Sequence, residues 1–232
     1  MPLFQKAIYS ISVAKPLDPY PHSRAEIAFA GRSNAGKSSA INALAGQRRL
    51  AFVSKRPGRT QMINFFSLGE DRFLVDLPGY GFATAPGATR SQWDRLLGSY
   101  LKHREALKGV ALIMDIRHPF TELDLQLIDF FSQCVKPIHI LLTKADKLSQ
   151  ARARLVLRDA AETLAQLSPQ HSVQLFSSLK HRGVEEAEAV FSRWLGLQAP
   201  AKQESKKPGP QNRPRVNFST RGRNKKPRAK GG

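Results

Sequence analysis

The sequence is poor in cysteine, poor in acidic residues and free of long apolar runs. Its 232 residues include one cysteine, Cys134, which excludes an internal disulfide framework and suits a reducing compartment. No apolar run approaches the roughly 20 residues that a membrane-spanning helix needs. The opening stretch, MPLFQKAIYSISVAKP, also lacks the long apolar segment of a signal peptide. We therefore expect a soluble, cytoplasmic protein.

Basic residues outnumber acidic ones: the chain has 37 Lys and Arg and 18 Asp and Glu, which gives a formal net charge of +19. The excess is concentrated in residues 200–232, where eleven Lys and Arg face Glu204 alone. This stretch has only two large apolar residues, Val216 and Phe218, so it cannot bury enough surface to offset the entropy of ordering. We expect a disordered tail that binds a polyanion, because neutralised phosphates release counterions. The alternative is a solubilising tail without a specific partner.

The chain divides into three segments: an irregular N-terminal arm at 1–23, a domain at 24–198 and the basic, disordered tail at 199–232. Apolar and amphipathic runs predict the elements of the domain. The expected strands cover 25–31, 62–68, 72–77, 110–116, 137–143 and 172–178. The expected helices cover 37–46, 91–109 (with Ser91 as its N-cap), 121–134, 149–167 and 183–195. This alternation favours an α/β fold with a mostly parallel, six-stranded sheet and helices on both faces.

The stretch GRSNAGKS at 31–38 matches the Gly-x-x-x-x-Gly-Lys-Ser pattern of a phosphate-binding loop, and it lies between an expected strand and an expected helix. Gly31 and Gly36 let the backbone curl so that successive N–H groups face a phosphate. Lys37 would reach the β- and γ-phosphates, and the Ser38 hydroxyl would bind Mg²⁺. The alternative is an ordinary glycine-bearing turn.

Two further segments offer groups to the same phosphates. Asp76 ends an apolar strand in Asp-Leu-Pro-Gly, which places a carboxylate at the magnesium ion, and Gly79 could turn its N–H toward the γ-phosphate. Thr60 ends the basic stretch PGRT and could give a second hydroxyl to Mg²⁺ when a γ-phosphate is present. Alone, Thr60 would read as a loop residue; its place between the phosphate loop and Asp76 favours the magnesium role.

The stretch LLTKADK at 141–147 predicts recognition of guanine. Asp146 can accept hydrogen bonds from two adjacent N–H groups of guanine, a pattern that adenine does not present. The stem of Lys144 can lie across the face of the purine. The backbone of Ser177–Leu179, in FSSLK, could donate to the guanine carbonyl. These elements in this order predict GTP binding.

At these residues the chain resembles a Ras-like GTPase of the TrmE–Era–EngA–septin superfamily and, more narrowly, the bacterial EngB (YihA/YsxC) family. The matching segments are AFAGRSNAGKSS, KRPGRTQ, VDLPGYGFA, MDIRHP, LLTKADKL and FSSLK, which run from about residue 25 to 195. Thr143 stands where most GTPases have Asn, as in the variant Thr-Lys-x-Asp motif of this family. The resemblance implies a three-layer P-loop GTPase fold, a role in late assembly of the large (50S) ribosomal subunit and a link to cell division and septation.

The resemblance also implies which residues contact GTP and Mg²⁺. The nucleotide contacts would come from Gly31, Arg32, Ser33, Asn34, Ala35, Gly36, Lys37, Ser38, Gly58, Arg59, Thr60, Gln61, Met62, Asp76, Leu77, Pro78, Gly79, Thr143, Lys144, Ala145, Asp146, Ser177, Ser178 and Leu179. The metal ligands would be Ser38, Thr60 and Asp76, and the catalytic groups Lys37, Gly79 and Asn34. We expect the protein to act as a monomer.

Tyr80 follows Gly79 where Ras-type enzymes hold a glutamine that orients the attacking water. A phenol cannot both donate and accept as an amide does, so hydrolysis should be no faster than roughly 10⁻³ s⁻¹. We expect Tyr80 to pack beneath the switch. Asn34 matches a position that coordinates K⁺ beside the phosphates in several relatives, where a cation would stabilise transition-state charge; otherwise Asn34 is a turn residue. Docking on a ribosomal particle is, after K⁺, the second possible source of faster GTP hydrolysis.

Three functions remain open on the sequence. The first is a GTP-switched assembly factor that docks on ribosomal RNA through basic surfaces, including the tail. The second is a nucleotide-gated division scaffold in which hydrolysis is incidental. The third is an RNA-binding protein whose nucleotide domain is structural. The formal charge of +9 on residues 1–199 favours RNA over a protein scaffold.

Overall fold

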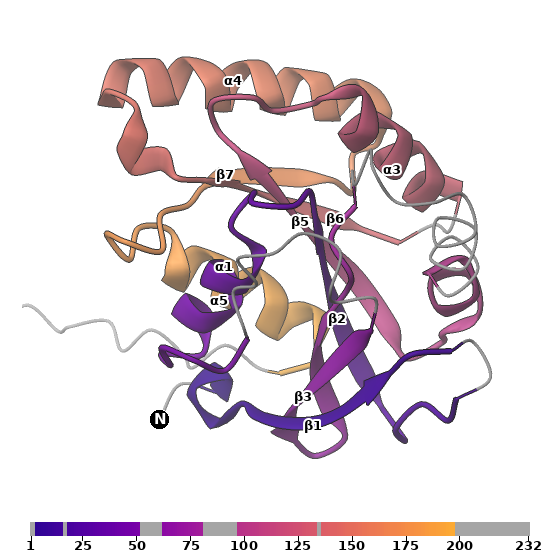
Figure 1. Cartoon of the computed structure of the whole chain (residues 1–232). Coiled ribbons are helices and arrows are strands. Elements are labelled where there is room, and N and C mark those ends of the chain that lie inside the picture. The colour runs from indigo at the N-terminus through magenta and orange to yellow at the C-terminus, as the bar shows by residue number, and fades with distance from the viewer. Residues whose placement is uncertain (1–2, 16–17, 52–61, 81–96, 134–135, 198–232) are drawn as a thin grey trace, which may run out of the picture. The chain divides into compact units, whose positions relative to one another are not determined.

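A computed structural model describes residues 3–15, 18–51, 62–80, 97–133 and 136–197. These residues form one sheet of seven strands in the order β1-β3-β4-β2-β5-β6-β7 (Figure 1). The strands are β1 (Ile8–Val13), β2 (Ala25–Gly31), β3 (Ile63–Gly69), β4 (Arg72–Asp76), β5 (Leu107–Asp115), β6 (Ile138–Thr143) and β7 (Ser172–Leu175). Only the pairs that involve β3 are antiparallel, so the sheet is mostly parallel, as predicted, but has one strand more than the six expected.

Helices cover both faces of the sheet, as the alternation of elements predicts (Figure 1). The described helices are α1 (Lys37–Leu44), a helical stretch at 97–103, α3 (Glu122–Gln133), α4 (Gln150–Leu167) and α5 (Val184–Trp194), with short 3₁₀ turns η1 (Leu3–Lys6) and η2 (Ala145–Lys147). Ile41 of α1 and Phe191 of α5 belong to one apolar core. Tyr100 and Phe131 belong to a second core on the opposite face, which gives three layers.

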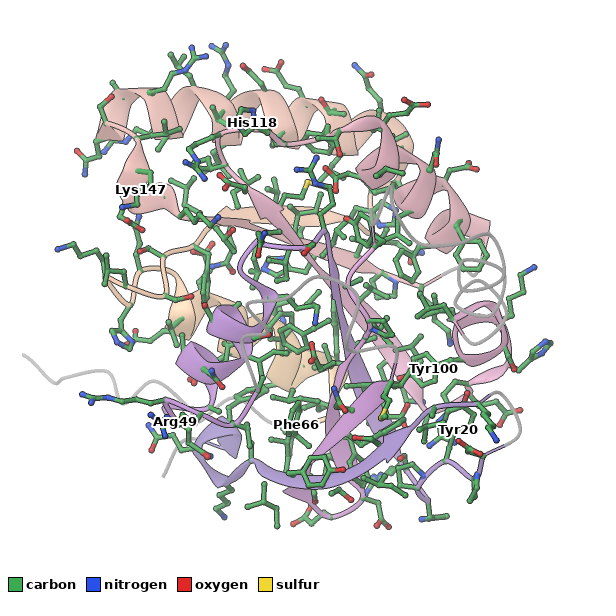
Figure 2. All side chains as sticks on the ribbon, in the orientation of Figure 1. Tyr20, Arg49, Phe66, Tyr100, His118 and Lys147 are labelled. Carbon is green, nitrogen blue, oxygen red and sulfur yellow. The ribbon has the colours of Figure 1, made fainter. Side chains whose placement is uncertain are left out.

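The parallel register brings the carboxyl ends of four strands to one edge of the sheet. Every residue of β2, β4 and β6 is buried, which explains why these strands read as nearly continuous apolar runs. Phe29 lies opposite Asp76 in the β2–β4 pair, and Asp115 lies opposite Thr143 in the β5–β6 pair. Figure 2 labels Lys147 at this edge, just after β6. Ligands bind at such an edge in parallel sheets.

The N-terminal segment corrects the expectation of an irregular arm. Residues Ile8–Val13 form strand β1, which pairs with β3 at the outer edge of the sheet. Ile8 and Tyr9 remain 65% and 58% exposed, and only Val13 of this strand is buried. Residues 9–13 (YSISV) do alternate apolar and polar side chains, which was the available signal for a strand, although most of these side chains stay exposed.

The helix expected at 91–109 also needs correction. The described part of this helix ends at His103, and β5 begins at Leu107 rather than at residue 110. Leu107 pairs with Glu26 of β2. This tertiary pairing overrides the local helical pattern, which continues through the junction without a breaking residue. Ser91 lies outside the described residues.

No helix within the described ranges is both long and apolar enough to cross a membrane. Cys134 and residues 198–232 lie outside the described residues. The domain boundary at 198, the disorder of the tail and its polyanion partner therefore remain predictions.

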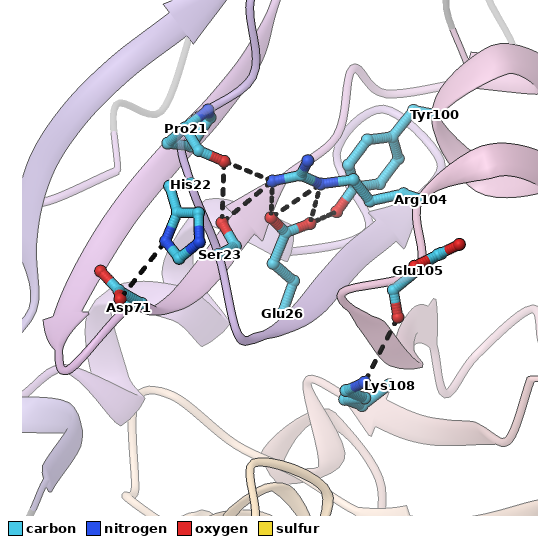
Figure 3. A network of polar contacts seen from close by, with 9 residues as sticks. All are labelled: Pro21, His22, Ser23, Glu26, Asp71, Tyr100, Arg104, Glu105 and Lys108. Carbon is cyan, nitrogen blue, oxygen red and sulfur yellow. Dashed lines mark hydrogen bonds and ion pairs between the residues drawn. The ribbon is translucent and has the colours of Figure 1, made fainter.

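A buried carboxylate joins three elements at the other end of β2 (Figure 3). Glu26 is fully buried. Its carboxylate accepts a hydrogen bond of 2.8 Å from the Tyr100 hydroxyl and forms an ion pair of 2.5 Å with Arg104. The same guanidinium group donates to the Pro21 carbonyl oxygen at 2.6 Å and to the Ser23 hydroxyl at 3.0 Å. A buried charge with this many partners fixes the segment before β2 and the helix at 97–103 to the sheet.

We predict that Arg104→Met lowers the free energy of unfolding by about 3–5 kcal/mol, because it leaves the Glu26 carboxylate buried without its cation. Urea denaturation of the nucleotide-free protein measures the change. Arg104→Met combined with Glu26→Gln should recover part of the loss.

The control is Lys108→Met, which removes the same charge from an exposed position on β5 and should cost less than about 0.5 kcal/mol. A loss below about 1 kcal/mol for Arg104→Met would show that the ion pair does not hold these elements together.

Candidate functional site

The phosphate-binding loop predicted at 31–38 lies between β2 and α1 at the carboxyl edge of the sheet. A Cβ atom on Gly31 would come within 2.8 Å of the Ile113 carbonyl oxygen, so only glycine allows β2 to end this close to β5. Asn34 and Gly36 have φ of 64° and 104°, which turn the backbone back on itself. Gly36 is also the N-cap of α1 and offers no side chain to its first N–H groups. The loop therefore has the curled backbone that a phosphate needs.

Lys37 and Asp76 form an ion pair between α1 and the end of β4. Their side chains are only 12% and 9% exposed, so each largely compensates the buried charge of the other. Ser38 is the next residue of α1, in its first turn. Lys37, predicted to bind phosphate, and Asp76, predicted to bind the metal ion, are thus in direct contact.

The donor set fits Mg²⁺. Ser38 and Asp76 offer a hydroxyl and a carboxylate, which are the oxygen ligands that Mg²⁺ takes when phosphates complete its shell. Thr60, the third predicted ligand, lies outside the described residues. Among the described residues no group of three or more His, Cys, Asp and Glu could hold a metal ion by itself. A magnesium ion at this place would depend on the phosphates of a bound nucleotide.

The predicted switch segment runs alongside the phosphate-binding loop. The Leu77 amide donates to the Phe29 carbonyl oxygen at 3.0 Å, and the Ser33 amide donates to the Tyr80 carbonyl oxygen at 3.2 Å. A Cβ atom on Gly79 would lie 3.6 Å from both the Gly31 oxygen and the Ser33 nitrogen. Gly79 is therefore in contact distance of the loop, with its backbone next to the expected phosphate position.

Tyr80 packs in the core beneath the switch, as the sequence predicts. Its side chain is 6% exposed, and its hydroxyl donates a hydrogen bond of 2.6 Å to Asp124 at the start of α3. The second oxygen of Asp124 accepts from the amide and the hydroxyl of Thr121 at 2.9 and 2.7 Å. Burial raises the pKa of Tyr80 far above its ordinary value, and the Asp124 carboxylate raises it further. The phenol is therefore a neutral donor that joins the switch to α3.

The end of β6 is attached to the phosphate-binding loop. The Thr143 hydroxyl lies 2.5 Å from the Ala35 carbonyl oxygen and 2.9 Å from the Met114 carbonyl oxygen, so its proton can serve either one. Lys144 donates to the Asn34 carbonyl oxygen at 2.8 Å, across the mouth of the loop. Segments more than 100 residues apart in sequence thus form one rigid corner.

Asp146 lies in η2, at the end of the predicted base-recognition segment Thr143–Asp146. Its carboxylate accepts a hydrogen bond of 2.5 Å from the Ser177 hydroxyl, and this bond lowers the pKa of Asp146. Asp146 is therefore ionised at neutral pH and offers only acceptors. The Ala145 amide donates to the Phe176 carbonyl oxygen at 3.1 Å, which brings the two predicted base-recognition segments together.

The turn after β7 is closed by two backbone hydrogen bonds between Ser177 and Arg182. The Ser177 hydroxyl also accepts from the Lys180 amide at 3.2 Å. Ser178 lies within this turn, and Leu179 is 70% exposed at its tip. The turn therefore holds its backbone in a defined shape beside Asp146.

Two residues that sequence reasoning missed support this site. Asp115, at the end of β5, pairs with Lys144 at 3.0 Å and with Arg117 at 2.6 Å. Burial would raise the pKa of Asp115, but the bonds from Arg117 and Lys144 outweigh it and hold the pKa well below its usual range. Asp124 is the second missed residue. An acidic residue directly after an apolar strand, as in MDIRHP, was the available signal for Asp115; nothing local pointed to Asp124.

The structure brings most of the predicted residues to one edge. Their segments are Gly31–Ser38, Asp76–Gly79, Thr143–Asp146 and Ser177–Leu179. Met62 lies just before β3 and is 44% exposed. Gly58, Arg59, Thr60 and Gln61 lie outside the described residues, so their nucleotide contacts remain predictions.

Solved structures share the fold. The chain aligns with the crystal structure of a probable GTP-binding protein engB with a TM-score of 0.59 and 22% identity, over 74% of this chain and 99% of that one. It aligns with the structure of Era in complex with MgGDPNP and nucleotides 1506–1542 of 16S ribosomal RNA with a TM-score of 0.58 and 20% identity, over 79% and 61% of the two chains. At these identities the likeness concerns the fold alone.

Sequence relatives are much closer. The probable GTP-binding protein EngB of Nitrosomonas europaea is 57% identical over 194 residues, which cover 84% of this chain and 87% of the relative. The protein of the same name from Azoarcus sp. (strain BH72) is 59% identical over 196 residues, which cover 84% and 94%. Residues 26–144 match the family described as 50S ribosome-binding GTPase. The chain therefore belongs to the EngB family of the 50S ribosome-binding GTPases.

Proposed function

We propose that the protein binds GTP, hydrolyses it slowly and acts as a switch in late assembly of the large ribosomal subunit, with a linked role in cell division. One observation carries the proposal: the phosphate-binding loop, the Asp76–Gly79 segment and the base-recognition segment meet at one edge and are joined by direct bonds. The names of the relatives and the family description support the same reading.

Lys37 is the group that would respond to the phosphates. In this structure its ammonium is paired with Asp76. A bound triphosphate would offer it a stronger partner, and Asp76 would be released toward Mg²⁺ together with Ser38 and Thr60. Magnesium, when bound, neutralises charge on the β- and γ-phosphates. The ion pair thus neutralises the buried charges of Lys37 and Asp76 until the nucleotide binds.

Asp146 is the group that would select guanine. An ionised carboxylate can accept from the ring N–H and the amino group of guanine together, and the Ser177 hydroxyl holds it in place at 2.5 Å. The Lys144 stem would lie against the purine, because its ammonium is already fixed at Asn34. Adenine offers an acceptor at the ring position where guanine donates, so it would face this carboxylate unfavourably.

Hydrolysis is slow in this proposal because no described side chain takes the place of the missing glutamine. The Tyr80 hydroxyl is committed to Asp124, and the Gly79 backbone N–H remains as the switch donor. We propose that Asn34, which is exposed at the turn of the loop, binds K⁺ beside the phosphates. Docking on the ribosomal particle would provide the remaining acceleration.

The large ribosomal subunit is the proposed partner because the chain is strongly basic. Residues 1–199 carry a formal charge of +9, and residues 200–232 add +10. Such a surface attracts RNA over long distances and at high rates. In our proposal the tail contacts RNA phosphates, and the protein docks as a monomer.

Asp146→Asn should weaken GTP binding at least about 100-fold and allow xanthosine triphosphate to bind. The amide loses one of the two acceptors that face guanine, while its N–H group matches the carbonyl oxygen that xanthine has in place of the amino group. Titration calorimetry with both nucleotides measures the change. Glu162→Gln, which removes a charge from an exposed position on α4, is the matched control and should bind GTP within about twofold of the parent. GTP affinity within threefold of the parent for Asp146→Asn would argue against base recognition here.

Tyr80→Phe should leave single-turnover GTP hydrolysis within about twofold and reduce the free energy of unfolding by about 1–3 kcal/mol, because only the bond to Asp124 is lost. Phosphate release at saturating GTP and urea denaturation measure the two effects. Tyr9→Phe, on exposed β1, should change neither. A tenfold loss of hydrolysis in a folded Tyr80→Phe protein would instead give the phenol a catalytic role.

The assembly role is tested by sedimentation of the protein with ribosomal particles in the presence of GTP, GDP or a non-hydrolysable GTP analogue. We expect comigration with 50S material with GTP or the analogue and at least fivefold less with GDP. Equal binding in all three states would favour an RNA-binding protein with a structural nucleotide domain, and no comigration would favour a division scaffold. Either outcome would overturn the proposed switch.

A further inference from the structure

A cavity of about 350 Å³ lies between the loop that follows β5 and helix α4, outside the segments that form the nucleotide site. Its apolar lining includes Ile116 and Phe120 from the loop, Leu148 after η2 and Val156 from α4. Figure 2 labels His118 on this loop, close to α4. Sites for small molecules span about 300–1,000 Å³, so this one is large enough for a single nucleotide and far too small for a duplex.

Phe120 forms a fixed aromatic wall of this cavity. Its φ of 53° lies in the left-handed region, which is unusual and costly for an aromatic residue. The ring is half-buried and packs against the core, and the next residue, Thr121, is held by two bonds to Asp124. A planar base can stack on such a ring, and stacking of this kind accepts any base.

Two arginines, Arg117 and Arg152, line the cavity and make its rim positively charged. Arg152, on the first turn of α4, is exposed, and its guanidinium group has no bonded partner among the described residues. A cation at this end opposes the helix dipole, so helix stability does not explain its presence. Arg117 uses Nε and Nη2 on Asp115, which leaves its Nη1 group for another acceptor. The one acidic residue on the rim, Asp159, is paired with Arg158 at 2.9 Å.

We propose that this cavity binds one unpaired nucleotide of single-stranded RNA, with its base against Phe120 and Val156 and its phosphate at Arg117 and Arg152. Charge decides the class of occupant, because an apolar peptide would leave the Arg152 guanidinium and the Nη1 group of Arg117 without an acceptor, whereas RNA satisfies the ring and these donors together. Exposed Lys147 directly precedes Leu148 in the chain and adds a positive charge for the phosphate of an adjoining nucleotide in this proposal, which favours a strand over a free nucleotide. The inference rests on the proposed ribosomal role and names the RNA feature that one surface would recognise.

Photocrosslinking of the full chain to a uridine octamer with 4-thiouridine at one central position tests the proposal. We expect adducts, mapped by mass spectrometry, on residues 116–120 and 148–156. Arg152→Gln should reduce this adduct at least fivefold. The control, Arg154→Gln, removes the same charge from a neighbouring exposed position on α4 that does not line the cavity, and should change the adduct less than twofold. Both positions are exposed, so neither change should disturb folding.

Three results would overturn the inference. Adducts confined to residues 200–232 would assign RNA binding to the tail, and equal losses in the two variants would assign it to general charge. Competition by uridine monophosphate at the concentration of the octamer would make the occupant a free nucleotide. The experiment is run without GTP and with EDTA, so a protein that fails to bind GTP can still form the adduct, and one that lacks this RNA site can still bind GTP.

Discussion

The close approach of β2 to β5 at Gly31 is the constraint on which the site depends. A side chain at this position would meet the Ile113 carbonyl oxygen at 2.8 Å, so the register of the central strands and the start of the phosphate-binding loop depend on the same glycine. With that register, Asp76 ends beside Phe29 and Thr143 ends beside Asp115. Four strand ends then meet at one edge, and every group of the proposed nucleotide site starts from it.

Bonds between distant segments make this edge one unit. The Thr143 hydroxyl lies within hydrogen-bond distance of the Ala35 and Met114 carbonyl oxygens, and Lys37 forms an ion pair with Asp76. On the other side of the switch, Tyr80 is bonded to Asp124, which in turn holds Thr121 at the start of α3. A displacement of the backbone at Gly79 would therefore act on α3 through Tyr80, the next residue. The same connection ends beside Phe120 and the cavity at α4, so the two proposed binding sites share a physical link.

Much of the architecture followed from local patterns. The run AEIAFAG predicted β2 with its observed bounds, because a strand buried on both faces reads as a nearly continuous apolar run, interrupted here by Glu26 alone. Ser149 was the expected first residue of its helix and is the observed N-cap of α4. The errors arose where pairing partners decide the structure. Strand β1 is placed by its backbone pairing with β3, although most of its side chains stay exposed. Strand β5 begins inside a stretch that reads as helix, because Leu107 pairs with Glu26.

The sequence by itself determined the kinds of groups in the site and their order along the chain, because loop, carboxylate and base-recognition motifs each need particular residues at short, fixed spacing. Only the tertiary structure decided what those groups contact. Asp115 beside Lys144, Asp124 beside Tyr80 and Ser177 beside Asp146 join segments separated by roughly 30 to 45 residues. Hydrogen bonds and ion pairs act over about 3 Å, and no local pattern encodes which distant side chain the packing of the sheet brings within that reach.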